Sequence, residues 1–175
     1  TNSIIKQMIE VKNIKKVFGD KTIIEDVSSV MKAGQCNLII GSSGSGKTVL
    51  MKCMVGLFEP NEGEVLYSGE SFTAMTGSDK TEIRKQIGML FQGSALFDSQ
   101  TVEQNVMFPL NMFTKDSYKE KLRRVNEVLE RVNLVGANKK FPSEVSGGMK
   151  KRVALARAIV LNPKYLFCDE PNSGL

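Results

Sequence analysis

The spacing of apolar residues predicts strands in the first part of the chain and at two later points. Alternating apolar and polar residues predict two strands separated by the turn at Gly19-Asp20. Near-continuous apolar character at residues 36–40 predicts a parallel strand buried on both faces, and residues 165–168 read as another buried strand. Strands are therefore expected over residues 8–18, 22–31, 36–40, 64–67, 87–91 and 165–168.

Helical spacing dominates between residues 93 and 162. Residues 115–132 place Leu122, Val125 and Leu129 on one face with charges between them, which predicts an amphipathic helix. A short helix over residues 101–107 is expected to end near Pro109, because proline lacks the N–H group that a helix interior needs. Further helices are expected over residues 49–55, 79–85 and 147–160, the last of them capped by Ser146.

Composition narrows the classes of function. The 175 residues suffice for one domain with its own core, and no apolar run approaches the ~18 residues of a membrane span. The absence of histidine excludes a His-based catalytic triad. Cys36, Cys53 and Cys168 lie in apolar segments without metal-ligand spacing, so we expect buried thiols in a reducing compartment. The net charge of +5 favours a solvated surface, and no nucleic-acid partner is expected.

A glycine-rich stretch follows the expected strand at 36–40 and precedes an expected helix. It fits the pattern G-x-x-x-x-G-K-[ST], whose curled backbone directs N–H groups at phosphate oxygens. The helix N-terminus attracts the same anion. In this pattern Lys47 reaches the β- and γ-phosphates and the Thr48 hydroxyl binds Mg²⁺. The pattern consists of Gly41, Ser42, Ser43, Gly44, Ser45, Gly46, Lys47 and Thr48.

Two acidic residues directly follow the apolar run at 165–168. A strand that ends in a carboxylate places Asp169 at the carboxyl edge of the sheet, where open α/β sheets bind ligands. We expect Asp169 to hold Mg²⁺, directly or through water, and Glu170 to polarise an attacking water molecule. Such general-base help contributes about 10²–10⁴ in rate.

A second candidate anion site lies at Ser146-Gly147-Gly148. A capping serine followed by two glycines exposes backbone N–H groups at the positive end of a helix. Considered without the other motifs, this segment is equally well interpreted as an ordinary helix cap with no bound anion.

Taken together, these segments resemble the nucleotide-binding subunit of an ABC transporter over nearly the whole chain. Residues 41–48 resemble the Walker A motif, residues 165–170 the Walker B motif, Gln92 the Q-loop, and residues 145–149 the signature motif. Met149 and Val145 stand where that family usually has Gln and Leu. The resemblance implies an ATP hydrolase that uses ATP and Mg²⁺.

The resemblance also implies roles for individual residues. Glu170 is the expected catalytic residue, and Thr48, Gln92 and Asp169 are the expected metal ligands. In a head-to-tail pair of subunits, Ser146, Gly147 and Gly148 contact the γ-phosphate of ATP held by the partner. Phe18 matches an aromatic residue that stacks on adenine, with a core phenylalanine as the competing interpretation. The expected nucleotide-binding residues are thus Phe18, Gly41, Ser42, Ser43, Gly44, Ser45, Gly46, Lys47, Thr48, Val49 and Gln92.

The implied fold is α/β, a P-loop NTPase core of the ABC ATPase type with an N-terminal antiparallel β region. We expect one ATP-binding domain over residues 1–175, with core regions at 1–92 and 163–175 and an inserted helical subdomain at 93–162. The family continues beyond this point with a D-loop aspartate, further strands and a switch histidine. We therefore expect a C-terminally incomplete sequence that hydrolyses ATP poorly by itself.

Residues 88–110 point to a particular branch of the family. Their sequence resembles the ATPases that work with Mce-domain proteins in bacterial phospholipid transport, the Mla type. This resemblance implies a second ATPase subunit, membrane permease subunits and an Mce-type lipid-binding protein as partners. It places the protein in the cytoplasm, peripheral at the inner face of the bacterial inner membrane. The alternatives are an ABC ATPase of another transporter and a soluble ABC ATPase outside transport. A third alternative is a module that binds nucleotide without turnover.

Overall fold

The computed structural model describes residues 8–169. The chain forms two compact units, unit 1 over residues 1–84 and unit 2 over residues 85–175. No helix among the described residues combines the length and apolar character that crossing a membrane requires.

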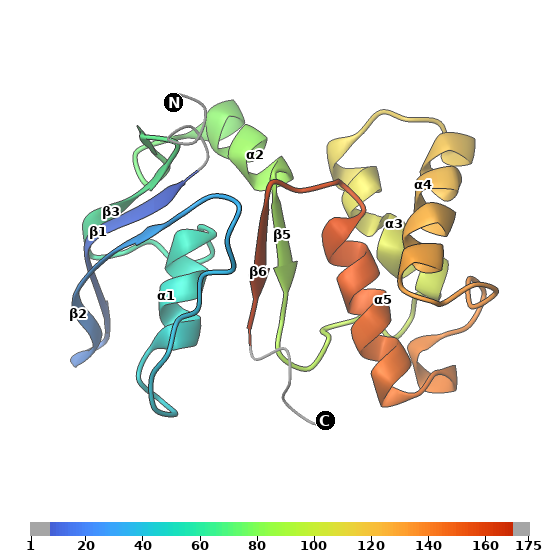
Figure 1. Ribbon diagram of the computed structural model, residues 1–175, viewed down its shortest axis with the longest axis horizontal. Coiled ribbons are helices and arrows are strands. Elements are labelled where there is room, and N and C mark those ends of the chain that lie inside the picture. Colours follow the sequence, from blue (N-terminus) through green and yellow to red (C-terminus); the bar gives the residue numbers. More distant parts are fainter. Residues whose placement is uncertain (1–7, 170–175) are drawn as a thin grey trace. The chain divides into compact units, whose positions relative to one another are not determined.

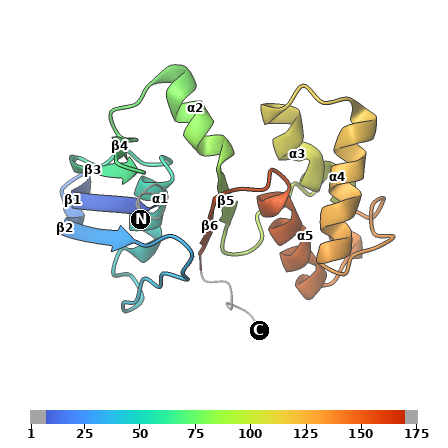
Figure 2. The same ribbon diagram turned by 45° about the horizontal axis from the view of Figure 1, so that its top comes forward.

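Unit 1 is built on a four-stranded antiparallel sheet with the order β2-β1-β3-β4 (Figure 1 and Figure 2). Ile9 pairs with Met31 on one side and with Tyr67 on the other, so β1 lies inside the sheet. The strands are β1 (Ile9–Phe18), β2 (Lys21–Met31), β3 (Glu62–Tyr67) and β4 (Glu70–Ser71), and the helices are α1 (Lys47–Met54) and α2 (Gly77–Lys85).

The core of unit 1 joins β1 and β3 to α1. Val11, Ile14 and Val65 are almost completely buried, as alternation on an antiparallel sheet with one covered face requires. The Tyr67 hydroxyl donates a hydrogen bond of 2.9 Å to the Met54 carbonyl oxygen at the end of α1. Its ring also packs edge-on against Phe72, with the ring centroids 5.2 Å apart. The hydrogen bond between Tyr67 and Met54 fixes the C-terminal end of α1 against the sheet.

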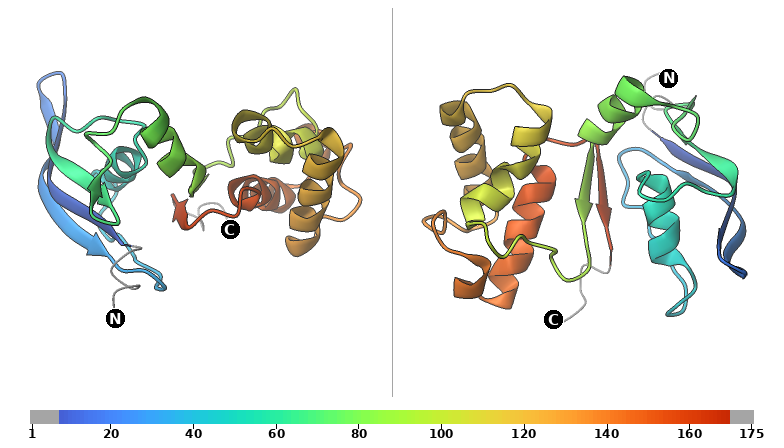
Figure 3. Two further views of the ribbon diagram at one scale, coloured as in Figure 1. Left: turned by 90° about the horizontal axis from the view of Figure 1, so that it is seen from above. Right: turned by 180° about the vertical axis from the view of Figure 1, so that it is seen from behind.

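Unit 2 combines a pair of parallel strands with a group of helices (Figure 3). Its elements are β5 (Ile87–Leu90), α3 (Val102–Phe113), α4 (Tyr118–Arg131), the 3₁₀ turn η2 (Pro142–Glu144), α5 (Gly147–Ile159) and β6 (Tyr165–Cys168). Helix α5 packs closely on β5 at Gly88, where an added Cβ would lie 2.4 Å from the Ala158 carbonyl oxygen. Only glycine leaves room for this approach.

The helices of unit 2 enclose one apolar core. Val102, Val125 and Val153, one from each long helix, are completely buried. The full set of buried residues is Val102, Val106, Met107, Leu110, Val125, Val128, Leu129, Val132, Leu134, Ala137, Val145, Val153, Ala156 and Val160.

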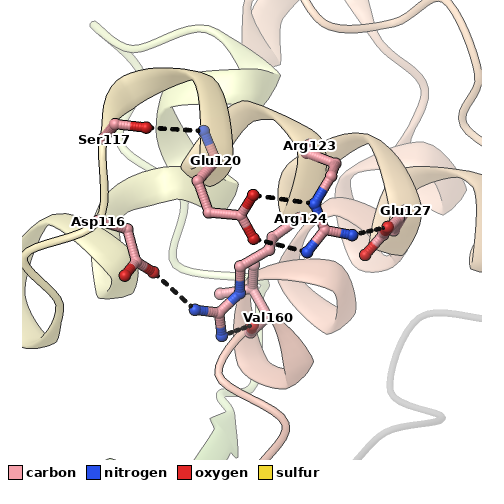
Figure 4. A network of polar contacts seen from close by, with 7 residues as sticks. All are labelled: Asp116, Ser117, Glu120, Arg123, Arg124, Glu127 and Val160. Carbon is pink, nitrogen blue, oxygen red and sulfur yellow. Dashed lines mark hydrogen bonds and ion pairs between the residues drawn. The ribbon is translucent and has the colours of Figure 1, made fainter.

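Polar contacts of α4 support this packing (Figure 4). Arg124 donates hydrogen bonds to an Asp116 carboxylate oxygen at 3.1 Å and to the Val160 carbonyl oxygen at 3.0 Å. It thereby satisfies a carbonyl at the C-terminal end of α5. Arg123 bridges Glu120 and Glu127 on the exposed side of α4. Such exposed helix pairs contribute only about 0.3–0.5 kcal/mol each, so the Arg124 contact matters more for the tertiary fold.

Most of the expected elements are present within a few residues of their expected bounds, but residues 36–40 do not form the expected strand. Among the described residues this segment pairs with no strand, and Leu38 and Ile40 are 78% and 84% exposed. Apolar character alone does not make a strand, because its backbone groups need a neighbour to pair with. The expected burial of residues 165–168 is also wrong in part, because Leu166 in β6 is 47% exposed.

Two smaller expectations fail as well. Helix α3 does not end near Pro109 but continues to Phe113. Leu110, one residue beyond the proline, is completely buried in the helical core, and this packing outweighs the hydrogen bond that Pro109 cannot donate. Of the three cysteines, Cys53 is buried, whereas Cys36 and Cys168 are exposed.

Candidate nucleotide-binding site

The glycine loop, residues 41–48, has the tight curvature that a phosphate cradle needs. Gly44 and Gly46 have φ angles of 78° and 91°, in the left-handed region that glycine adopts without strain. The Ser45 N–H donates to the Ser42 carbonyl oxygen at 3.2 Å and closes the turn between them. A Cβ at position 46 would also lie 3.1 Å from the Ile23 carbonyl oxygen of β2. Both the backbone angle and the space therefore call for glycine at 46.

The N-terminus of α1 differs from the N-termini of α3, α4 and α5. Thr101, Ser117 and Ser146 each cap a helix with a side-chain oxygen that accepts a backbone N–H. Helix α1 instead follows Gly46, which has no side chain to cap it. Its first N–H groups together with the helix dipole form the kind of end that binds anions. The residues present therefore fit a phosphate group.

Lys47 lies over the glycine loop. Its ammonium group donates hydrogen bonds of 2.8 Å to the carbonyl oxygens of Gly41 and Ser42. The charge is thus held at the mouth of the loop rather than extended into solvent. A Cβ at Gly41 would lie 2.5 Å from the Ser45 hydroxyl, which would have to rotate away.

The other expected nucleotide contacts in unit 1 remain accessible to different degrees. Ser42, Ser43 and Ser45 are exposed, and Thr48 and Val49 are partly buried at the start of α1. Phe18 is 43% exposed at the end of β1. Its ring meets Phe58 edge-on with centroids 5.3 Å apart, and the Lys16 ammonium lies 5.0 Å from the Phe18 centroid. Stacking of Phe18 on adenine remains a prediction.

In unit 2, Gln92 and Asp169 follow neighbouring parallel strands. The Asp169 N–H donates to the Leu90 carbonyl oxygen at 2.9 Å, which extends the β5–β6 pairing by one step. Asp169 is buried and directly follows β6, whereas Gln92 is exposed two residues after β5. The carboxyl ends of parallel strands are where α/β proteins place ligands. Amide and carboxylate oxygens such as those of Gln92 and Asp169 are also donor atoms that Mg²⁺ prefers.

The Ser-Gly-Gly segment, residues 146–148, starts α5 at an exposed surface. The Ser146 hydroxyl accepts the Met149 N–H at 3.2 Å, which confirms the expected cap. Ser146, Gly147 and Gly148 are exposed, and an added Cβ at either glycine would meet nothing within 4 Å. These glycines are therefore not required for packing within the described chain.

The expected residues are divided between the units. Unit 1 holds Phe18 and the glycine loop, and unit 2 holds Gln92, residues 146–148 and Asp169. Glu170 lies outside the described residues. Sequence reasoning missed Arg157, which binds the segment after Gln92, and the buried Glu103. The sequence signal for Arg157 was the presence of an arginine within a mainly apolar stretch of α5.

Comparison with known proteins decides the family. The family model described as "ABC transporter" matches residues 24–173. The chain belongs to the ABC transporter family. Its fold class is accordingly that of an ABC ATPase, α/β with an antiparallel β region.

Two curated relatives are similar over most of this ABC chain. The "probable ribonucleotide transport ATP-binding protein mkl" of Mycobacterium leprae is 45% identical over 95% of this chain and 48% of its own length. The "methionine import ATP-binding protein MetN" of Escherichia coli K12 is 45% identical over 96% of this chain and 50% of its own length. The chain thus spans about half the length of the curated relatives it matches.

A solved structure gives the same fold. It is a dimeric post-hydrolysis state of the ATP-binding cassette MJ0796 bound to ADP and Pi. It matches with a TM-score of 0.86 and 31% identity, over 95% of this chain and 75% of that one.

Proposed function

We propose that the protein is the subunit of an ABC transporter that binds and hydrolyses ATP. The observation that carries this proposal is the glycine loop, where Lys47 stands beside a helix end without a side-chain cap. The loop offers backbone N–H groups and one positive charge to the terminal phosphates of a nucleotide. Family membership supports the same conclusion.

Within this proposal the polar residues divide the work. Thr48, Gln92 and Asp169 would hold Mg²⁺, which would supply positive charge to the phosphate oxygens. Gln92 also senses the γ-phosphate. Glu170 accepts a proton from the attacking water and orients it. The Ser-Gly-Gly segment of a second copy closes over the same ATP, so binding brings two copies together and hydrolysis releases them.

The hydrolysis step can be tested separately from binding. Changing Glu170 to Gln in the full-length protein is expected to leave ATP affinity within about threefold and to lower turnover by about 10²–10⁴. Gel filtration with ATP should then show a stable dimer. Unchanged turnover would remove Glu170 from its role.

Partner subunits in the membrane have a candidate docking surface in unit 2. An apolar groove of about 270 Å³ lies between the strands and the helices. Its lining includes Phe91, Phe97, Phe108, Pro109, Phe113 and Arg157. We propose that a short helix of a permease subunit occupies it, since apolar anchors in grooves of this kind bind helices. We also propose that the chain is one ATP-binding domain, with core regions at 1–92 and 163–175 and a helical subdomain at 93–162. The protein is proposed to lie at the inner face of the bacterial inner membrane.

The substrate proposed is a phospholipid carried by an Mce-type system, supported by the sequence of residues 88–110. Methionine and a ribonucleotide are alternatives, because the similar relatives are named for those cargoes. Purification of the tagged full-length protein from membranes should recover an Mce-domain permease complex. Transport of labelled phospholipid by that complex in liposomes, with methionine as the comparison cargo, distinguishes the substrates. Recovery of a methionine permease instead would overturn the phospholipid proposal.

A further inference from the structure

An arginine on α5 binds the turn that follows Gln92. The Arg157 guanidinium donates one hydrogen bond of 2.9 Å to the Ala95 carbonyl oxygen and one of 3.0 Å to the Ser94 carbonyl oxygen. Arg157 lies on the helix that begins with the Ser-Gly-Gly segment. One side chain therefore joins that helix to the segment that carries the expected γ-phosphate sensor.

The turn that Arg157 binds is strained. Gly93, Ser94 and Ala95 have φ angles of 77°, 69° and 46°. Glycine adopts such angles freely, but in serine and alanine the Cβ crowds the following carbonyl group. A strained backbone persists only where its surroundings hold it. The two hydrogen bonds from Arg157 are contacts that hold this one.

The chain is anchored just beyond these three residues. The Asn105 side chain is completely buried. It accepts the Phe97 N–H at 2.8 Å and donates to the carbonyl oxygens of Phe97 and Gln100 at 3.1 Å each. Movement between Gln92 and this anchor must therefore occur in the turn that Arg157 binds.

The surroundings of the guanidinium make lysine a poor substitute. Burial lowers the pKa of Arg157, and its guanidinium carbon lies 5.8 Å from the centroid of the Phe97 ring. A planar guanidinium binds two carbonyls and stacks on a ring at the same time, whereas an ammonium group is a single point charge. Replacing Arg157 by Lys thus weakens the clamp while keeping the charge.

We propose that Arg157 is a positioning residue that sets the place of Gln92 by clamping residues 94–95, and so couples Gln92 to the helix of the Ser-Gly-Gly segment. This inference rests on the proposed role of Gln92 in ATP hydrolysis. Arg157 itself does not touch the nucleotide in this scheme. Because Arg157 also lines the apolar groove, a helix docked there contacts the clamp directly.

The same helix provides a matched control. Arg152 donates from one nitrogen to the carbonyl oxygens of Val132 and Asn133 at 3.3 and 2.9 Å. Asn133 also has a positive φ, of 56°. Arg152 therefore binds a comparable turn, but that turn is not connected to Gln92. A general effect of losing an arginine from α5 should appear in both Arg152→Lys and Arg157→Lys.

The test uses the full-length protein in its transporter complex and the variants R157K, A95G, R157K/A95G and R152K. We expect R157K to lower kcat about tenfold, as the loss of one charge-assisted hydrogen bond implies, with ATP affinity within about twofold. In R157K/A95G, kcat should recover at least partly, since glycine adopts a positive φ without a clamp. R152K should keep the wild-type kcat.

A second measurement does not depend on activity. Amide hydrogen exchange of residues 93–97 is expected to quicken in R157K and to slow again in R157K/A95G, while α5 keeps its protection in both. Wild-type kcat in R157K, unchanged exchange at 93–97, a loss that A95G does not reduce, or an equal loss in R152K would each overturn the proposal. A wild-type complex without ATP turnover would instead count against the proposed function, and the exchange result would still decide whether Arg157 clamps the turn.

Discussion

Replacing Glu103 by alanine is expected to destabilise unit 2, because three donors converge on its buried carboxylate. Glu103 is 5% exposed at the start of α3. It accepts hydrogen bonds from the Tyr118 hydroxyl at 2.8 Å, from the Asn138 amide at 3.1 Å and from the Lys139 ammonium at 3.3 Å. The carboxylate thereby connects α3 to the start of α4 and to the loop before the Ser-Gly-Gly segment.

The size of the effect follows from the exposure of each donor. A hydrogen bond to a charged group contributes about 1.5–3 kcal/mol when it is buried. The Lys139 side chain is 81% exposed, so its ion pair contributes only about 0–1 kcal/mol. Tyr118 is 60% exposed, so in E103A its hydroxyl can form a hydrogen bond to water instead. Asn138 is partly buried, so the loss of its hydrogen bond to Glu103 costs more. Together these values give a loss of about 2–4 kcal/mol for E103A.

The same carboxylate predicts how stability depends on pH. Burial by itself raises the pKa of Glu103, but the hydrogen bonds from Tyr118, Asn138 and Lys139 outweigh it and lower the pKa. A lowered pKa means that folding favours the ionised form. This contribution is therefore fully present above the unfolded pKa of about 4.3 and is lost as the pH falls through that value toward the folded pKa.

Urea unfolding followed by circular dichroism measures both effects. The variants are E103A, Tyr118→Phe and their combination, with E127A as an exposed control. At pH 7 the double-mutant cycle should give a favourable coupling between Glu103 and Tyr118, which should fade below pH 4. The free energy of unfolding of E127A should lie within about 0.5 kcal/mol of the wild-type value. The reasoning fails if E103A is equally close to wild type, or if E103A loses the same free energy of unfolding at pH 7 and at pH 3.

Three further predictions concern packing and capping. Leu110→Ala should cost about 2–5 kcal/mol because Leu110 is completely buried, whereas Met112→Ala on the same helix, 60% exposed, should cost under about 0.5 kcal/mol in the same urea titration. Gly88→Ala should lower stability by about 1–3 kcal/mol through its contact with the Ala158 carbonyl, and an unchanged melting temperature would contradict that crowding. Ser146→Ala should cost about 1 kcal/mol by removing the α5 cap, and Ser146→Asp should retain the cap, so equal losses in both would count against capping.

The sequence predicted the structural features that depend on interactions between residues close together in the chain. The glycines at 44 and 46 and the capping Ser146 act through their own backbone and near neighbours, and the structure has them as expected. The alternating residues of β1 and β2 were equally informative, because a hairpin pairs segments that are adjacent in sequence.

The failures have distant causes. Residues 36–40 carry an apolar pattern, but pairing depends on a neighbour that local sequence does not reveal. Helix α3 passes Pro109 because Leu110 has a place in a core formed by other helices. Glu103 and Arg157 are held by residues 36 and 62 positions away, at Lys139 and Ala95, and a single sequence carries no signal of that proximity.

The most direct test of the account is the affinity of the full-length protein for ATP before and after Lys47→Ala. Titration calorimetry with Mg²⁺ and ATP should show wild-type binding that weakens about a hundredfold in the variant, because charge-assisted hydrogen bonds to phosphate are lost. Lys52→Ala, at the other end of α1, is the control and should bind like wild type. Equal affinity in the Lys47→Ala variant and the wild type would contradict the assignment of the glycine loop as the phosphate site.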